Sequence, residues 1–304
     1  MMTFQDLLGI EHPIIQAPMA GVQGSALAIA VSNAGGLGSL PCATLSPAQM
    51  SAELSAIQAG TDRPYNVNFF CHNQPEPDAQ REATWRAMLA PYYEEYGITQ
   101  PDAIPVGAGR APFSEEAANL LEHFKPPVVS FHFGLPSEKL MARVKAIGSK
   151  ILSSATTVGE AQWLEERGVD AIIAQGFEAG GHRGMFLSRD ITTQIGTFAL
   201  VPQIVSAVRI PVIAAGGIAD SAGVAAALKL GAIAAQIGTA YMLCPEATTA
   251  PLHRSALKSE ASRKTALTNL FSGRPDSDRS PACARNPSSP RKPAAAPPAD
   301  CLRA

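Results

Sequence analysis

A single histidine follows a pair of glycines, directly after an apolar run in this chain. The run 169–174 predicts a buried strand, and Gly180, Gly181 and His182 come soon after it. Proteins built from parallel strands place their reactive groups in the loops at the carboxyl ends of those strands. An imidazole there can hold an anionic substrate or remove a proton from it. We therefore predict that His182 is catalytic; the alternative is a structural histidine, the role we expect for the other five.

Two glycine turns follow later apolar runs and are suited to an anion. Gly216 and Gly217 end one run, while Gln236, Gly238 and Thr239 end the next. Backbone N–H groups in such turns, together with a helix amino terminus, bind phosphate. A full dinucleotide fingerprint is absent. The turns therefore predict one phosphate, which indicates FMN rather than NAD or FAD; ordinary turns without a ligand remain the alternative.

Two more motifs end apolar runs and offer contacts to a flat ring. Ala17, Pro18 and Met19 form the first, in which the Met19 thioether can lie against an aromatic ring. Asn68 ends another run, and its amide offers both a donor and an acceptor to the edge of a pyrimidine-like ring. A core methionine and a solvated asparagine are the alternatives. We expect these residues to line the same pocket as His182.

The elements that must position these residues alternate between short apolar strands and longer helical stretches. This order predicts a parallel sheet, and about eight such units on one core predict a TIM (β/α)8 barrel of the α/β class. Residues 75–97 have a helical pattern and predict an inserted helix over the barrel mouth, where it would act as a lid. The strand candidates are residues 14–16, 37–40, 65–69, 103–106, 128–131, 150–153, 171–174, 212–215 and 234–237.

Composition excludes several classes of function. The 304 residues carry a net charge of −2 and are 46% hydrophobic, so there is no basic excess for a nucleic acid. The five cysteines are widely spaced and fit neither a disulfide framework nor a metal site. No signal peptide or membrane-spanning run is present, so we expect a cytoplasmic protein without a membrane partner.

The composition changes abruptly at the end of the barrel segment, residues 1–275. Residues 276–304 contain six prolines and neither aromatic nor β-branched residues. Such a segment cannot bury enough apolar surface to offset the entropy of ordering. We expect a disordered Pro/Ala/Arg/Ser-rich tail.

Residues 4–275 resemble the nitronate monooxygenase family, formerly called 2-nitropropane dioxygenases, and in particular its bacterial class I. The discriminating stretches are Asn66–Phe70, Ser130–Pro136 and Thr268–Pro275. Other stretches similar to that class are residues 16–21, 175–183, 238–241 and 244–247.

The resemblance implies a barrel that holds FMN without a covalent bond, in a monomer or homodimer. It implies oxidation of alkyl nitronates, notably propionate 3-nitronate, by O2 through a flavin semiquinone, with a carbonyl compound and nitrite or nitrate as products. His182 matches the histidine that would hold the anionic nitronate. The residues that match or adjoin FMN-contacting positions are Ala17, Pro18, Met19, Asn68, Gln175, Gly180, Gly216, Gly217, Gln236, Gly238 and Thr239.

The chain departs from the family pattern at Asp276. Family members continue there with an ordered helical segment, whereas this chain turns to Pro, Ala, Arg and Ser. We hypothesise a frameshift, which resequencing of the coding region would test. Two rival functions remain at this point. One is a flavin-dependent enoyl-acyl-carrier-protein reductase, which NADH would reduce, and the other is an inert flavin-binding remnant.

Overall fold

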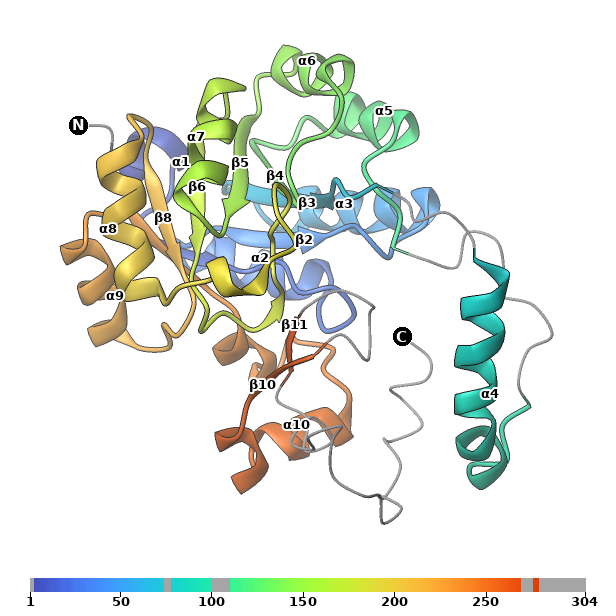
Figure 1. Cartoon of the computed structure of the whole chain (residues 1–304). Coiled ribbons are helices and arrows are strands. Elements are labelled where there is room, and N and C mark those ends of the chain that lie inside the picture. The colour runs from blue at the N-terminus through green and yellow to red at the C-terminus, as the bar shows by residue number, and fades with distance from the viewer. Residues whose placement is uncertain (1–2, 74–77, 100–109, 269–275, 279–304) are drawn as a thin grey trace.

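Eight parallel strands form a closed barrel in the computed structural model, which describes residues 3–73, 78–99, 110–268 and 276–278 (Figure 1). The strands pair in the order β1-β9-β8-β6-β5-β4-β3-β2, and a bridge between Ile15 and Leu37 closes the ring. The barrel strands are β1 (Ile14–Gln16), β2 (Gly38–Pro41), β3 (Tyr65–Phe70), β4 (Val128–His132), β5 (Lys150–Ala155), β6 (Ala171–Gln175), β8 (Val212–Ala215) and β9 (Ala234–Ile237).

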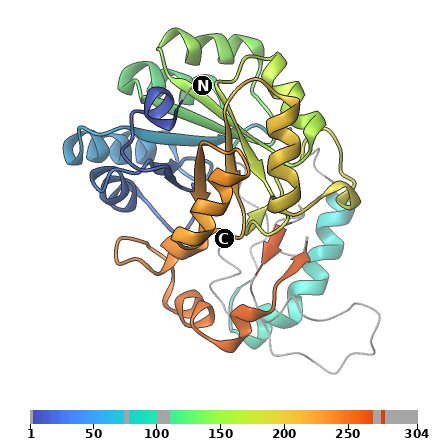
Figure 2. The same cartoon turned by 90° about the vertical axis from the view of Figure 1, so that its left-hand side faces the viewer.

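These eight strands confirm eight of the nine candidates and the TIM barrel. The ninth candidate, residues 103–106, lies outside the described residues. Helices surround the barrel, as the view in Figure 2 shows. The helices are α1 (Phe4–Leu8), α2 (Ser25–Asn33), α3 (Pro47–Gly60), α4 (Ala79–Glu95), α5 (Glu115–Phe124), α6 (Glu138–Ala146), α7 (Val158–Glu166), α8 (Thr197–Ala207), α9 (Ser221–Lys229) and α10 (Pro251–Leu257), with 3₁₀ helices η1 (Ile191–Thr193), η2 (Thr239–Leu243) and η3 (Glu260–Arg263).

The strands divide the core into two layers because successive side chains point to opposite faces of a strand. On β6, Ile172 and Ala174 join the layer between strands and helices, whereas Ala171 and Ile173 join the layer inside the barrel. The inner layer also contains Leu7 of α1. Both faces of these strands are buried, which explains why they are continuous apolar runs in the sequence.

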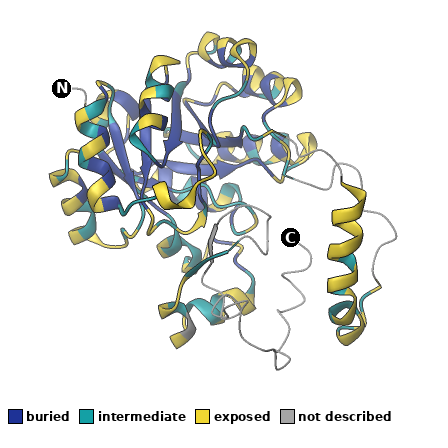
Figure 3. Cartoon of the chain, in the orientation of Figure 1, coloured by how far each residue is buried: buried dark blue, intermediate teal, exposed yellow. Residues whose placement is uncertain are grey.

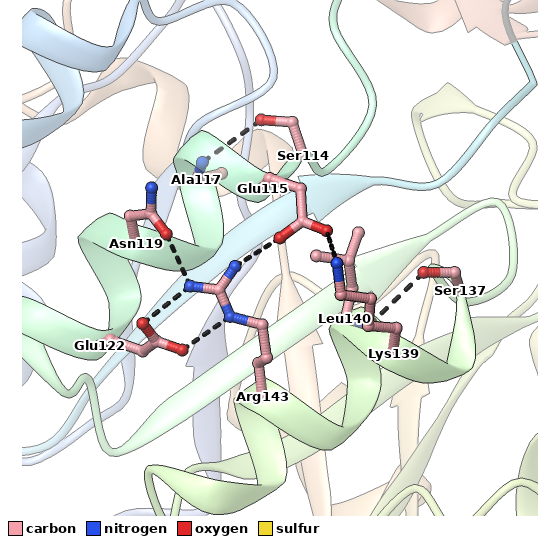
Figure 4. A network of polar contacts seen from close by, with 9 residues as sticks. All are labelled: Ser114, Glu115, Ala117, Asn119, Glu122, Ser137, Lys139, Leu140 and Arg143. Atoms are coloured by element: carbon pink, nitrogen blue, oxygen red, sulfur yellow. Dashed lines mark hydrogen bonds and ion pairs between the residues drawn. The ribbon is translucent and has the colours of Figure 1, made fainter.

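Helices α5 and α6 are joined on their outer faces by charged side chains (Figure 4). Arg143 pairs with Glu115 at 2.6 Å and with Glu122 at 2.7 Å, and Lys139 pairs with Glu115 at 2.8 Å. The acidic partners are half exposed, so solvent screens these pairs and each contributes little to stability. Burial of the apolar faces of the helices, not these pairs, therefore fixes this side of the barrel.

The inserted helix is α4, and it agrees with the helical pattern of residues 75–97. It begins after Asp78, whose side chain accepts a hydrogen bond from the backbone N–H of Arg81. No α4 residue is buried, and Trp85 and Met88 are exposed. The helix stands apart from the barrel in Figure 1 and is exposed along its length in Figure 3. In the described structure α4 therefore buries none of its residues against the barrel, and its role as a lid stays a prediction.

A second, three-stranded sheet lies at the carboxyl end of the barrel. It contains β7 (Gly181–His182), β10 (Ala266–Thr268) and β11 (Asp276–Asp278), all antiparallel. Asp276 pairs with His182, so the chain beyond the expected boundary at residue 275 continues for three residues as the central strand of this sheet. Backbone pairing with β7 and β10 orders these residues despite their composition. The rest of the expected tail, residues 279–304, lies outside the described residues.

Among residues 3–73, 78–99, 110–268 and 276–278, every helix is too short or too polar to cross a membrane.

Candidate active site

The loop between β6 and β7 is held by the side chain of Gln175, the last residue of β6. Its Nε2 donates to the carbonyl oxygen of His182 at 2.9 Å, and its Oε1 accepts from the backbone N–H of Gly184 at 2.7 Å. Both ends of the amide are thus used inside the protein. Gln175, which we expected to contact a flavin, acts first as the residue that positions His182.

The imidazole of His182 lies beside a guanidinium group and two aromatic rings. Its Nε2 is 3.3 Å from Nη1 of Arg110, and its ring meets Phe70 and Phe133 edge to face, with centroids 6.0 and 5.8 Å apart. A guanidinium group only donates, so this contact is a hydrogen bond when Nε2 carries no proton. Nδ1 then carries the proton. Together, His182 and Arg110 form a site with hydrogen-bond donors for an anion.

A second histidine, His132, contacts the backbone of His182. Nε2 of His132 lies 3.3 Å from the carbonyl oxygen of His182, and Nδ1 lies 2.9 Å from the hydroxyl oxygen of Ser154. A carbonyl oxygen only accepts, so Nε2 of His132 donates and, in the neutral ring, Nδ1 accepts from the hydroxyl. The sequence led us to expect a purely structural role for His132. The structure instead makes it a positioning residue for His182.

The next residue along the chain, Arg183, lies under the loop and is 1% exposed. It donates to the carbonyl oxygens of Gly176 at 2.9 Å and Gln175 at 3.0 Å, and to the side chain of Gln194 at 3.1 Å. Burial disfavours the charged form and lowers the pKa of Arg183 to about 10. This guanidinium group therefore ties the loop to the barrel from below.

The side chain of Glu178 connects this loop to the start of α8. Its Oε2 accepts from the backbone N–H of Thr197 at 2.7 Å and from the Thr197 hydroxyl at 2.9 Å. Thr197 is the first residue of α8, so the carboxylate caps that helix. Glu178 thus fixes the loop to α8, and its negative charge partly offsets the lowering of the Arg183 pKa.

The two predicted glycine turns meet this loop. Gly216 and Gly217 have φ angles of +121° and +71°, which side chains disfavour. A β-carbon on Gly216 would lie 2.8 Å from the backbone nitrogen of Ala179, and one on Gly217 would lie 3.2 Å from Cβ of Glu178. Only glycine allows the turn after β8 to approach the turn after β6 so closely.

The turn after β9 joins the same group. A β-carbon on Gly180 would lie 3.5 Å from the hydroxyl of Thr239, and one on Gly238 would lie 3.7 Å from the sulfur of Met19. It would also lie 3.6 Å from Cβ of Ala17, the neighbour of Pro18. The structure therefore brings the motifs after β1, β6, β8 and β9 together at one end of the barrel.

The side-chain amides of Asn68 and Gln236 differ in how far their hydrogen-bonding capacity is already used. Nδ2 of Asn68 on β3 donates to the hydroxyl of Ser130 at 2.9 Å, so part of this amide is used between strands. Oε1 of Gln236 on β9 is buried without a hydrogen-bond partner among the described residues. An unpaired buried acceptor costs about 1–3 kcal/mol. Gln236 and the glycine turns therefore fit a ligand that brings its own hydrogen-bond donor and an anionic group.

Residues 2–285 match the family model described as nitronate monooxygenase. The chain belongs to the nitronate monooxygenase family. A nitronate monooxygenase of Paraburkholderia phytofirmans is 49% identical over 269 residues, which cover 88% of this chain and 73% of that protein. A nitronate monooxygenase of Pseudomonas aeruginosa is 45% identical over 273 residues, covering 89% and 77% respectively. The protein is therefore an oxidoreductase of a family that is flavin-dependent in general.

Solved structures agree with this membership. Nitroalkane oxidase from Streptomyces ansochromogenes has a TM-score of 0.81 and 39% identity, over 90% of this chain and 78% of that one. FabK from Thermotoga maritima has a TM-score of 0.71 and 31% identity, over 93% of this chain and 76% of that one. Both similarities extend over the whole barrel, and the first is the higher in score and identity.

Sequence reasoning missed Arg110 and the positioning role of His132. Arg110 follows an apolar stretch but has no spacing relation to His182, from which it is 72 residues distant in the chain. His132 belongs to a stretch that resembles the family, which was a usable signal. The partners of both residues become visible only when the loops after β3, β4 and β6 are brought together.

Proposed function

We propose that this protein uses FMN to oxidise alkyl nitronates, with propionate 3-nitronate as a suitable substrate, by reaction with O2. The products would be a carbonyl compound and nitrite or nitrate. The observation that carries the proposal is the position of the His182–Arg110 pair, in the same loop cluster as the glycine turns. An anion site beside a phosphate site is what a nitronate and FMN require together.

We propose that the turns of Gly216–Gly217 and Gly238–Thr239 hold the FMN phosphate. Gln236 would then pair its Oε1 with a ring N–H group, which satisfies the buried acceptor. The other proposed contacts come from the same cluster and from β3. They are Ala17, Pro18, Met19, Asn68, Gln175 and Gly180.

The bound FMN supplies the one-electron oxidation. The side chains of this protein bind and orient the nitronate. Arg110 donates to the anionic oxygen atoms, and His182 donates from Nδ1 as long as its Nε2 accepts from Arg110. Phe70 and Phe133 meet the imidazole edge to face and limit the access of water, which strengthens these charge interactions.

The test is anaerobic mixing of the purified protein, loaded with FMN, with propionate 3-nitronate while the visible spectrum is recorded. A rapid change of the oxidised flavin spectrum, reversed by admitting O2, supports the proposal. Bound FMN that nitronate leaves unchanged contradicts it. In that case bleaching by NADH would indicate a reductase, and no response to either would indicate an inert flavin-binding protein.

A further inference from the structure

The backbone of Phe133, the residue that follows β4, has a φ angle of +69°. Residues with a side chain rarely adopt this left-handed region, because Cβ comes too close to the following carbonyl oxygen. Among the described residues other than glycine, only Lys125 shares it, with a φ angle of +47°. Lys125 ends α5, and a left-handed residue commonly ends a helix. Phe133 instead follows a strand, so its strained backbone needs a different explanation.

The positive φ angle changes the face to which the ring of Phe133 points. Side chains on a strand alternate between its two faces, and Phe131 on β4 points to the layer between strands and helices. Residue 133 would point the same way if the strand continued. Its ring instead packs with Phe70, in a cluster separate from that layer. The turn after β4 therefore brings two consecutive side chains, His132 and Phe133, to the candidate active site.

The ring of Phe133 is 5% exposed and lies among the aromatic groups around His182. Its centroid is 4.4 Å from that of His132, 5.0 Å from that of Phe70 and 5.8 Å from that of His182. The centroids of Phe70 and His182 are 6.0 Å apart. These distances place both phenyl rings on the same side of the imidazole. We call the rings of Phe70 and Phe133 the phenyl wall.

Two neighbours hold the turn that carries the Phe133 ring. The hydroxyl of Ser153 on β5 donates to the carbonyl oxygen of Gly134 at 3.1 Å. Phe186 packs closely against the turn, because a β-carbon on Gly134 would lie 3.2 Å from its Cδ2. The surrounding structure thus keeps the ring in a place that the local backbone disfavours. Strain of this kind persists mainly at functional sites, where neighbouring contacts offset its cost.

Given the proposed function, on which this inference rests, we propose that Phe133 determines specificity by excluding branched nitronates. A nitronate that contacts both His182 and Arg110 has the phenyl wall as a neighbour, because the wall packs against the imidazole. The reacting carbon of an unbranched nitronate carries a hydrogen atom, where a branched nitronate carries a second alkyl group. A misfit of one methyl group changes kcat/KM by about 10–200-fold. The fixed ring therefore favours the unbranched substrate.

The test compares propyl-1-nitronate with propyl-2-nitronate, two isomers that differ only in branching at the reacting carbon. The readout is the ratio of their kcat/KM values, which does not depend on how much of each variant is folded or loaded with flavin. Phe133→Ala should shift this ratio at least about tenfold toward the branched isomer. Phe133→Leu keeps a bulky apolar side chain and should shift it less.

A second pair of variants separates the ring from the backbone. Phe133→Gly and Phe133→Ala both remove the wall, but only glycine accepts the positive φ angle without strain. We expect both to shift the isomer ratio alike. In urea, the unfolding equilibrium constant of Phe133→Gly should be about tenfold smaller than that of Phe133→Ala.

The matched control lies at Lys125, which is exposed and shares the positive φ angle. Lys125→Gly should likewise be more stable than Lys125→Ala, because the same strain is relieved. Neither variant should change the isomer ratio, since Lys125 ends α5 and contributes no ring to the wall.

Modification of His182 by diethyl pyrocarbonate tests the wall without flavin or nitronate. Carbethoxylation of His182, measured by peptide mass spectrometry, should be several-fold faster in Phe133→Ala, because the neighbouring ring no longer limits access to the imidazole. Lys125→Ala should react at the rate of the parent chain.

An unchanged isomer ratio in Phe133→Ala and Phe133→Gly, with an active parent, would overturn the role of Phe133 alone. An unchanged rate of His182 carbethoxylation in Phe133→Ala would overturn the wall itself. A parent chain that oxidises neither isomer would instead contradict the proposed function, and the specificity with it. The failure of the inference is thus distinguishable from the failure of the function.

Discussion

The loop that carries His182 and the seam between β9 and β1 are built in opposite ways. The loop is held by polar side chains, because Gln175, His132 and Arg183 donate to carbonyl oxygens within or beside it. The seam is flanked by an apolar groove with small side chains, which lies between α2 and α9. The candidate catalytic histidine is thus fixed by local hydrogen bonds, whereas the seam between β9 and β1 presents apolar surface that the described residues leave uncovered.

The largest expected effect concerns the buried guanidinium group under the loop. Arg183→Met leaves the carbonyl oxygens of Gly176 and Gln175 and the side chain of Gln194 without their donor. We expect the free energy of unfolding to fall by about 3 kcal/mol, since unpaired buried acceptors cost about 1–3 kcal/mol each and the relief of a buried charge offsets part of this loss. Urea unfolding measures the change.

The matched control is Arg209→Met. Arg209 is exposed and, within the described part of the chain, only its backbone N–H makes a hydrogen bond, to Glu165. Its replacement should change stability by less than about 0.5 kcal/mol. If Arg183→Met and Arg209→Met lowered the free energy of unfolding equally, the hydrogen bonds of Arg183 would not be what holds the loop.

The second prediction compares the alkylation rates of two buried cysteines with that of a cysteine in the apolar groove between α2 and α9. Burial raises the pKa of the Cys42 and Cys71 thiols well above the usual range, because it disfavours the thiolate. Cys244 lines the groove and is half buried. Near pH 8, iodoacetamide should therefore alkylate Cys244 about 100-fold faster than Cys42 or Cys71, since the thiolate is the reactive form. Peptide mass spectrometry in the Cys283→Ser, Cys301→Ser background measures these rates; comparable rates at Cys42 and Cys244 would contradict an open groove.

The smallest effect is expected at His132, which positions His182 without being proposed to touch the substrate. His132→Phe removes the contacts with the His182 carbonyl oxygen and the Ser154 hydroxyl. We expect kcat/KM for propionate 3-nitronate to fall about tenfold, because a misplaced donor loses part of its transition-state contact. Steady-state oxygen consumption measures the loss.

Conservative replacement separates positioning from a general structural role. His132→Gln can still donate from Nε2 and should recover part of the activity. His123→Phe changes an exposed histidine on α5 and should have no effect. If His132→Phe and His132→Gln lower kcat/KM equally, the hydrogen bond to the His182 carbonyl oxygen does not account for the loss.

The sequence predicted the strands well because their signal is local. A run such as Ala171–Ala174 must be apolar on both faces wherever a parallel strand is covered on both sides, so its pattern is visible without any partner. The glycine turn after β8 was predictable for a similar reason, since the positive φ angles of Gly216 and Gly217 require glycine.

The features of the fold and the site that the sequence did not predict depend on contacts between distant segments. Nothing near Arg110 indicates that it meets His182, and nothing near Arg183 indicates that a charged side chain is buried. The sequence of α4 has helical spacing, but spacing alone does not say whether an apolar face finds a surface to cover. The pairing of β11 with β7 likewise depends on backbone hydrogen bonds that composition does not encode.

The central claim is that His182 and Arg110 act together on one anion. The direct test is a double-mutant cycle of His182→Ala and Arg110→Met, with kcat/KM for propionate 3-nitronate as the readout. We expect losses of about 100-fold for His182→Ala and about tenfold for Arg110→Met, with the double variant close to His182→Ala alone. Fully multiplicative losses, or an active His182→Ala variant, would contradict the account.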